Sequence, residues 1–332
     1  MQSLKGHHKN TPSFIKQNSL VKPSFSASLA KTLNVQGASN LKFGAVSYNQ
    51  KHNLLIVCPS NQTIQFYDAT TLKPLRERQA CKIYGGVMSL TFQPETDTYV
   101  FGCASGFIYQ YNIPKDEIKR LKAYDSPILR VAFLHDNFYA FSMWTSKKVH
   151  LGNLENKNVL TFDLKNCHSF CLYHFAKKNL LFTGLNDGKM IIYRTNKLPH
   201  LQMVCSVQTG GWVLTTQSIN INGKEYMITS SKDQNVKIWC LVKGKMRLVR
   251  VIPNEEIPYS VVYLENYKVI AVAYHSNEIK FFGLLTGKLE RTFDLSRNDE
   301  YRMFLVKDKN MIGVTSENTN LIKFIQLSPE GS

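Results

Sequence analysis

One short strand pattern of alternating character recurs seven times along the chain. The copies begin at residues 64, 108, 149, 190, 236, 279 and 322, so successive starts lie 44, 41, 41, 46, 43 and 43 residues apart. They read IQFYD, IYQYN, VHLGN, MIIYR, VKIWC, IKFFG and IKFIQ. A spacing this regular indicates an internal structural repeat. Any fold of this chain must therefore place seven similar units in series.

Each copy has the same kind of surroundings. A second β-rich segment precedes it across a short polar turn, a third lies further upstream, and a more polar fourth follows. In the second repeat these segments are 98–103, 87–92 and 119–124. Because helical periodicity is almost absent, four strands every 40-odd residues predict the blades of a propeller. We expect an all-β fold, a seven-bladed β-propeller of four-stranded antiparallel blades.

The repeats also carry a degraded sequence motif. The copies end in pairs such as Tyr67-Asp68 and Trp239-Cys240, and turn aspartates remain at Asp187 and Asp233. On these features residues 30–327 resemble the WD-repeat (WD40-like) family, as a divergent member. The family's Gly-His before the first strand is missing, so the hydrogen-bonded tetrad that the resemblance implies is mostly absent. We therefore expect the blades to be joined mainly by apolar packing.

The two ends of the repeat region complement each other. After the seventh copy ends near Leu327 the fourth strand is missing, whereas an extra strand, 30–36, precedes the first blade. An unpaired edge strand is an aggregation hazard, and the family resemblance implies that the N-terminal strand completes the last blade. We predict a propeller over 29–328. Residues 1–28, with four lysines, no acidic residue and two prolines, predict a flexible basic arm.

Composition restricts the class of protein and the cofactors it needs. No apolar run approaches the roughly 20 residues that span a bilayer, and no secretory signal is evident. The seven cysteines do not pair by spacing. The tightest cluster is Cys167, His168, Cys171 and His174, but strand alternation would place its cysteines and histidines on opposite faces. We expect no metal, no small-molecule cofactor, no membrane span and a cytoplasmic location. Cytoskeletal and nuclear assemblies, and a mitochondrial presequence, remain alternatives.

The net charge of +17, from 41 Lys and Arg against 24 Asp and Glu, favours acidic partners. Arginine binds phosphate in a bidentate manner better than lysine does, but lysine outnumbers arginine in this chain. Basic side chains that are merely solvated at the surface would therefore account for the charge as well. No nucleotide-binding loop, nucleophile elbow or zinc-protease motif occurs. The sequence therefore predicts binding rather than catalysis.

The family resemblance implies that the loops before the first strand and between the second and third strands gather on one face. Trp, Tyr and Arg dominate interface energies, and those loops are rich in them. The partner-binding candidates are Tyr84, Arg130, Trp144, Lys147, Lys148, Trp212, Lys232, Tyr259 and Arg302.

We expect a non-catalytic scaffold that docks other proteins with acidic surfaces within a larger multiprotein assembly. The alternative is an RNA-associated propeller of a ribosome-biogenesis or RNA-processing particle, which would bind with a steep salt dependence. A third class, a propeller enzyme whose catalytic groups converge from distant blades, is proposed by no motif in the sequence.

Overall fold

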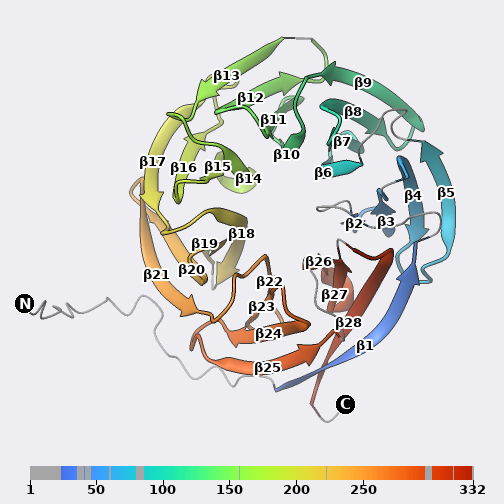
Figure 1. Cartoon of the computed structure of the whole chain (residues 1–332), viewed down its shortest axis with the longest axis vertical. Helices are drawn as coiled ribbons and strands as arrows, with labels where there is room; N and C mark the ends of the chain where they lie inside the picture. Colours follow the sequence, from blue (N-terminus) through green and yellow to red (C-terminus); the bar gives the residue numbers. More distant parts are fainter. Residues whose placement is uncertain are drawn as a thin grey trace, which may run out of the picture.

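The protein forms a closed ring of seven four-stranded antiparallel sheets around a central axis (Figure 1). The region on this axis, inside the innermost strands, is called the channel below. The computed structural model describes residues 24–35, 41, 46–59, 61–79, 86–156, 158–221, 223–295, 301–316 and 318–330. The predicted all-β, seven-bladed propeller is confirmed, and all seven repeated segments lie in the third strands of their blades.

Within each of the first six blades the strands follow chain order from the channel outward, and neighbours are antiparallel. Blade 1 contains β2 (Val46–Asn49), β3 (Leu54–Val57), β4 (Thr63–Asp68) and β5 (Pro74–Gln79). Blade 2 contains β6 (Val87–Gln93), β7 (Thr98–Cys103), β8 (Phe107–Asn112) and β9 (Glu117–Ala123). Blade 3 contains β10 (Ile128–Phe133), β11 (Phe138–Met143), β12 (Lys148–Asn153) and β13 (Val159–Asp163).

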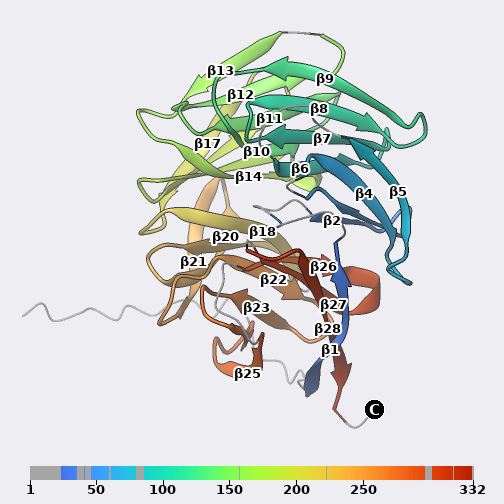
Figure 2. The same cartoon turned by 45° about the vertical axis from the view of Figure 1, so that its right-hand side comes forward.

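Blades 4 to 7 continue the ring (Figure 2). Blade 4 contains β14 (Ser169–Phe175), the 3-10 turn η1 (Ala176–Lys178), β15 (Leu180–Leu185), β16 (Lys189–Arg194) and β17 (Gln202–Gln208). Blade 5 contains β18 (Val213–Ile221), β19 (Lys224–Ser231), β20 (Asn235–Val242) and β21 (Lys245–Pro253). Blade 6 contains β22 (Ser260–Leu264), β23 (Val269–Ala273), β24 (Glu278–Gly283) and β25 (Leu289–Asp294). Blade 7 contains β26 (Tyr301–Val306), the 3-10 turn η2 (Lys307–Lys309), β27 (Met311–Ser316), β28 (Leu321–Pro329) and β1 (Phe25–Asn34).

The alternation of strands gives the ring two different faces. One, here called the loop face, carries the connections between blades and the turns between second and third strands. The other, the turn face, carries the remaining hairpins. No helix in the part of the chain that the structure describes is long and apolar enough to cross a membrane.

Apolar packing between neighbouring sheets holds the blades together, as expected from the missing tetrad. Each of seven apolar clusters contains side chains from two adjacent blades, so each fills one seam of the ring. In the seam between blades 1 and 2, for example, Phe66 packs on Tyr111 with 5.3 Å between ring centroids. The core is therefore a circle of seven inter-sheet layers rather than one central mass.

Polar side chains add a second kind of link between blades, close to the channel. On an inner strand, a side-chain oxygen accepts a hydrogen bond from a backbone N–H of the next inner strand. Ser89 Oγ binds Val131 N at 3.1 Å, Gln217 Oε1 binds Tyr263 N at 3.2 Å, and Ser260 Oγ binds Met303 N at 3.1 Å. These bonds satisfy backbone N–H groups of the inner strands that are not paired within their own four-stranded sheet.

The family-like motif residues of blade 5 retain part of their hydrogen bonding. Trp239 Nε1 donates to Thr229 Oγ1 at 2.9 Å across the sheet. Asp233 accepts from the backbone N–H of Asn235 at 3.2 Å and pairs with the Lys237 ammonium. The turn aspartate thus shapes its own hairpin and pairs with a lysine of the third strand of the same blade.

β1 closes the ring by completing blade 7, whose strand order is β1-β28-β27-β26. This confirms the expected closure, but β1 begins at Phe25 rather than near residue 30. The extension is stabilised because Phe25 is buried against Tyr267 and Phe281, with ring centroids 5.4 and 5.5 Å away. Residues 25–28, assigned above to the arm, are therefore paired strand. Residues 1–23 lie outside the described part of the chain.

Candidate interaction face

Three of the predicted binding residues meet on the loop face. Trp144 directly follows β11, Trp212 directly precedes β18, and Lys232 directly follows β19. Trp144 belongs to blade 3, and Trp212 and Lys232 belong to blade 5. One continuous set of contacts joins them through Phe170 of β14 in blade 4. We call Trp144, Phe170 and Trp212 the aromatic row.

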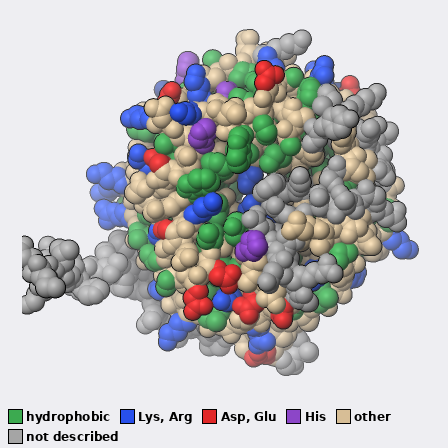
Figure 3. Space-filling view, viewed as in Figure 1, with side chains coloured by type: hydrophobic (Ala, Val, Ile, Leu, Met, Phe, Trp, Pro, Cys, Tyr) green, Lys and Arg blue, Asp and Glu red, His purple; other side chains and the backbone are tan. Residues whose placement is uncertain are grey.

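Each ring of the aromatic row contacts its neighbour. Trp144 meets Phe170 edge-on at 5.7 Å between centroids, and Phe170 stacks on Trp212 at 4.9 Å and 18°. Lys232 Nζ lies 4.1 Å from the Trp212 ring centroid, a cation–π contact. Trp144 keeps 54% of its surface exposed. Figure 3 views the loop face and shows apolar side chains gathered beside the channel mouth.

Phe170 is a member of this surface that the sequence did not predict. Strand alternation suggests a core position, but the pairing shifts register between Ser169 and Cys171, which leaves Phe170 as a bulged residue. A bulge redirects a side chain that regular pairing would keep in line. The same shift occurs in blades 2, 3 and 5, at Met88, Leu129 and Leu214. The sequence signal that could have identified Phe170 is the recurrence of this position when the repeats are aligned.

Arg130 and Arg302 lie near the channel rather than on the aromatic row. Arg130 Nη1 donates to the Leu129 carbonyl at 2.8 Å, and Arg302 Nη1 donates to the Tyr259 carbonyl of blade 6 at 2.9 Å. Burial raises the pKa of the Cys171 thiol to about 11, although both guanidinium groups act to lower it. Arginines from blades 3 and 7 thus place positive charge beside one inner strand of blade 4.

Tyr259 belongs to a region of opposite charge over blade 6. Its ring lies 6.2 Å from that of His275. Burial, together with the carboxylates of Glu256, Glu278 and Glu255, raises the pKa of nearby Tyr274. Figure 3 shows acidic side chains gathered below the channel on this face. The loop face is therefore divided between an acidic region on blade 6 and the aromatic row with its lysine.

The remaining candidates are spread around the aromatic row. Lys147 and Lys148 are exposed, and Lys147 Nζ lies 3.5 Å from Asn166 Oδ1 of the next blade connection. Tyr84 lies outside the described residues. The structure thus unites Trp144, Trp212 and Lys232 in one set of contacts through Phe170.

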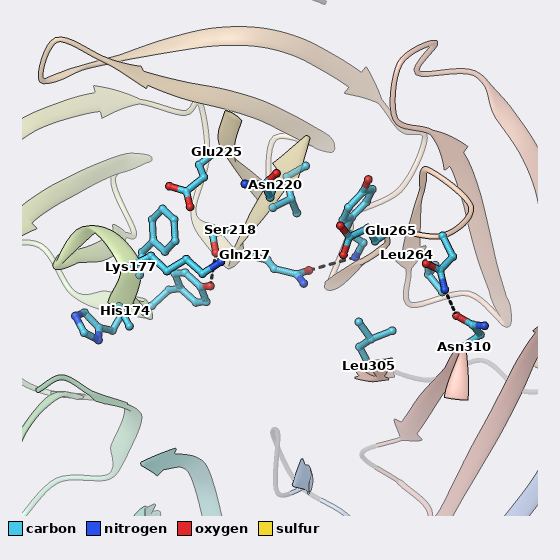
Figure 4. Close-up of a pocket in the computed structure, with 16 residues that line it drawn as sticks. His174, Lys177, Gln217, Ser218, Asn220, Glu225, Leu264, Glu265, Leu305 and Asn310 are labelled. Atoms are coloured by element: carbon cyan, nitrogen blue, oxygen red, sulfur yellow. Dashed lines mark hydrogen bonds between the residues drawn. The ribbon is translucent and has the colours of Figure 1, made fainter. Parts of the chain in front are cut away.

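A polar recess of about 440 Å³ lies between the inner strands of blades 4 to 7 on the turn face (Figure 4). Its side chains already bind one another: Tyr173 Oη and Ser218 Oγ are 2.7 Å apart, and Asn266 Nδ2 donates to Asn310 Oδ1 at 2.6 Å. Burial, aided by nearby His135, lowers the pKa of His174 to about 4. Because these hydrogen bonds connect neighbouring blades, the polar side chains of the recess have a structural role.

The cluster considered for zinc does not gather around one point. Among the described residues, no group of three or more His, Cys, Asp or Glu side chains is placed to hold a metal ion. Cys171 is buried in the seam between blades 4 and 5, whereas Cys167 lies in the turn before the strand and is partly exposed.

His150 of blade 3 makes stability depend on pH. It is 7% exposed, stacks on Phe141 at 4.9 Å and lies 2.8 Å from Ser146 Oγ through Nε2. Burial, and to a smaller extent Lys148, lowers its pKa from 6.5 to about 4. The unfolded chain therefore binds a proton near pH 6.5, whereas the folded chain does so only near pH 4, so stability falls as pH drops between these values.

We expect His150 to cost about 2–3 kcal/mol of stability at pH 4.5 relative to pH 7.5. His150→Phe should lose correspondingly less over that interval, as measured by urea unfolding at both pH values. His200→Gln, which changes an exposed histidine, should behave like the unaltered protein. An equal loss in His150→Phe would show that this histidine is not responsible.

The comparisons with known proteins support the architecture at the level of fold. No protein-family model matches the chain, and no curated protein matches its sequence. The β-propeller domain of Cps50 (Swd1) from Myceliophteria thermophila superposes with a TM-score of 0.75 at 11% identity, covering 91% of this chain and all of that domain. In all, 1857 chains of solved structures match. The likeness shows a β-propeller fold, and a fold so widely shared does not select a function.

Proposed function

We propose that this protein is a non-catalytic interaction scaffold that docks a partner protein on its loop face, with the aromatic row at the centre of the contact. The observation that carries the proposal is the row itself. It contains two tryptophans and a phenylalanine from three blades in continuous contact, with Trp144 54% exposed and Lys232 at one end.

The composition of the row supports an interface of high affinity. Tryptophan is enriched among the residues that contribute most to binding, each worth about 2 kcal/mol or more when removed. Because Phe170 and Lys232 both contact the Trp212 ring, little side-chain entropy would be lost on binding. A partner with an apolar anchor and an acidic residue opposite Lys232 fits this surface best.

Two features favour a protein partner over RNA. Single-stranded RNA binds aromatic residues by stacking bases on their open faces, but the Trp212 ring already stacks on Phe170 and carries the Lys232 ammonium over it. The acidic side chains Glu255, Glu256 and Glu278 on the same face would also repel phosphates.

The test is affinity capture with the full chain, comparing the unaltered protein with Trp144→Ala/Trp212→Ala. We expect recovery of the specific partners to fall at least about tenfold, since losing ~1.4 kcal/mol already changes affinity tenfold. Met203→Ala/Leu75→Ala is the matched control, because both residues are comparably exposed, at 60% and 57%, but lie on outer strands.

Two outcomes would contradict the proposal. Undiminished recovery with the double tryptophan variant would show that the row is not the docking site. Recovery that disappears on ribonuclease treatment, and that falls steeply with salt, would identify RNA as the partner.

A further inference from the structure

Blade 5 is longer than its neighbours, and the additional length extends beyond the turn face. Its strands have 9, 8, 8 and 9 residues, whereas those of its neighbours, blades 4 and 6, have 5 to 7. At the loop face the first pairs of blades 4 and 5, Ser169 with Leu185 and Val213 with Ser231, are equivalent. The paired strands of blade 5 therefore run about 7 Å further at the opposite end, at ~3.3 Å per residue.

A groove of about 560 Å³ separates these strands from blade 4. Its floor consists of the buried side chains Leu180, Phe182 and Met227. Its projecting wall consists of the half-buried Leu241, Val242 and Met246, together with Gly223 and Gly244 at the hairpin turns. A groove of this size accommodates several apolar side chains of a peptide.

The rim of the groove is positively charged. Lys178, Lys224 and Lys243 are exposed around it. Among the described residues that line it, Glu225 is the one carboxylate, and its Oε2 lies 3.6 Å from Lys178 Nζ. Lys224 and Lys243 therefore carry the excess positive charge. Charge complementarity therefore favours an occupant that carries acidic residues next to its apolar ones.

We propose that this groove is a second binding site, which takes a short segment of a partner protein with apolar side chains flanked by Asp or Glu. The apolar side chains enter between blades 4 and 5, and the carboxylates pair with the rim lysines. The site is independent of the loop face, because its residues lie at the opposite end of the same two blades.

The test uses a random displayed-peptide library and the full chain. Peptides that bind the variant Lys178→Glu/Lys224→Glu/Lys243→Glu are first removed from the library. The remaining peptides are then selected for binding to the unaltered protein. The most enriched peptide is synthesised with a fluorescein label, and its affinity is measured by anisotropy. We expect the enriched peptides to combine apolar and acidic residues, and the triple variant to bind the labelled peptide at least tenfold more weakly.

Two controls locate the site. Lys119→Glu/Lys197→Glu/Lys288→Glu reverses three exposed lysines elsewhere and should weaken binding less than threefold. Trp144→Ala/Trp212→Ala should leave peptide affinity unchanged, even if the loop face proves to bind nothing. The proposal is overturned if no peptide is enriched, if the enriched peptides lack acidic residues, or if either control weakens binding as much as the groove variant.

Discussion

A chain that lacks residues 1–35 is expected not to fold into a stable monomer, whereas one that lacks only residues 1–23 should melt within a few degrees of the full chain. The first truncation removes all of β1, which pairs with β28 from Phe25↔Pro329 to Asn34↔Leu321. Each ladder hydrogen bond contributes about 0.5–1.5 kcal/mol. The buried Phe25, Leu33 and Val35 contribute about 1.5–3 kcal/mol each.

These contributions approach the whole stability of a typical domain, about 5–15 kcal/mol. Thermal melting followed by circular dichroism checks the comparison. Phe25→Ala is an intermediate variant, and we expect it to lose about 3 kcal/mol because it loses its contacts with Tyr267 and Phe281. Closely similar melting of the two truncated chains would mean that the ring is held closed without β1.

The second large effect on stability is expected at two glycines that lie directly against a buried side chain of the next blade. A Cβ at Gly102 of β7 would lie 2.4 Å from Ile128 Cγ2 of β10, and one at Gly184 of β15 would lie 2.6 Å from Val213 Cβ of β18. Ile128 and Val213 are fully buried, so neither has room to move away. Gly102→Val and Gly184→Val should each cost about 2–3 kcal/mol by overpacking.

Because the two glycines lie in different seams, the double variant should lose about 4–6 kcal/mol, measured by urea unfolding. Ile128→Ala supplies the control. It creates space opposite Gly102, so Gly102→Val should cost at least about 1 kcal/mol less when combined with it. If the effects of the two substitutions on the free energy of unfolding were strictly additive, the cost of Gly102→Val would not arise from its contact with Ile128.

The repeat made the architecture predictable because each copy is a local pattern. Alternation and turn chemistry within about 40 residues define a blade, and the missing final strand indicates the closure. The start of β1 was predicted too late, since Ser26, Ala27 and Ser28 show no apolar alternation. Phe25 is recognisable as core only through Tyr267 and Phe281, more than 240 residues away in sequence.

The candidate surface was predictable in part for the same reason. Trp144, Trp212 and Lys232 stand beside predicted turns, where residue type and position both favour exposure. Phe170 depends on a bulge, which alternation alone does not reveal. The groove beside blade 5 depends on the relative length of two neighbouring sheets, although the turn at Gly223 is evident in the sequence.

The closure of the ring also determines when it can assemble. A hydrogen bond joins Ser26 Oγ to the Ser328 carbonyl, 302 residues later in the chain, and Glu330 N donates to the Ser24 carbonyl at 3.1 Å. During synthesis the first six blades emerge and can form from local contacts, but β1 has no partner until β28 leaves the ribosome. The last blade therefore forms only after nearly the whole propeller has been made. The nascent protein must keep one strand unpaired for the entire interval, and an unpaired edge strand is an aggregation hazard.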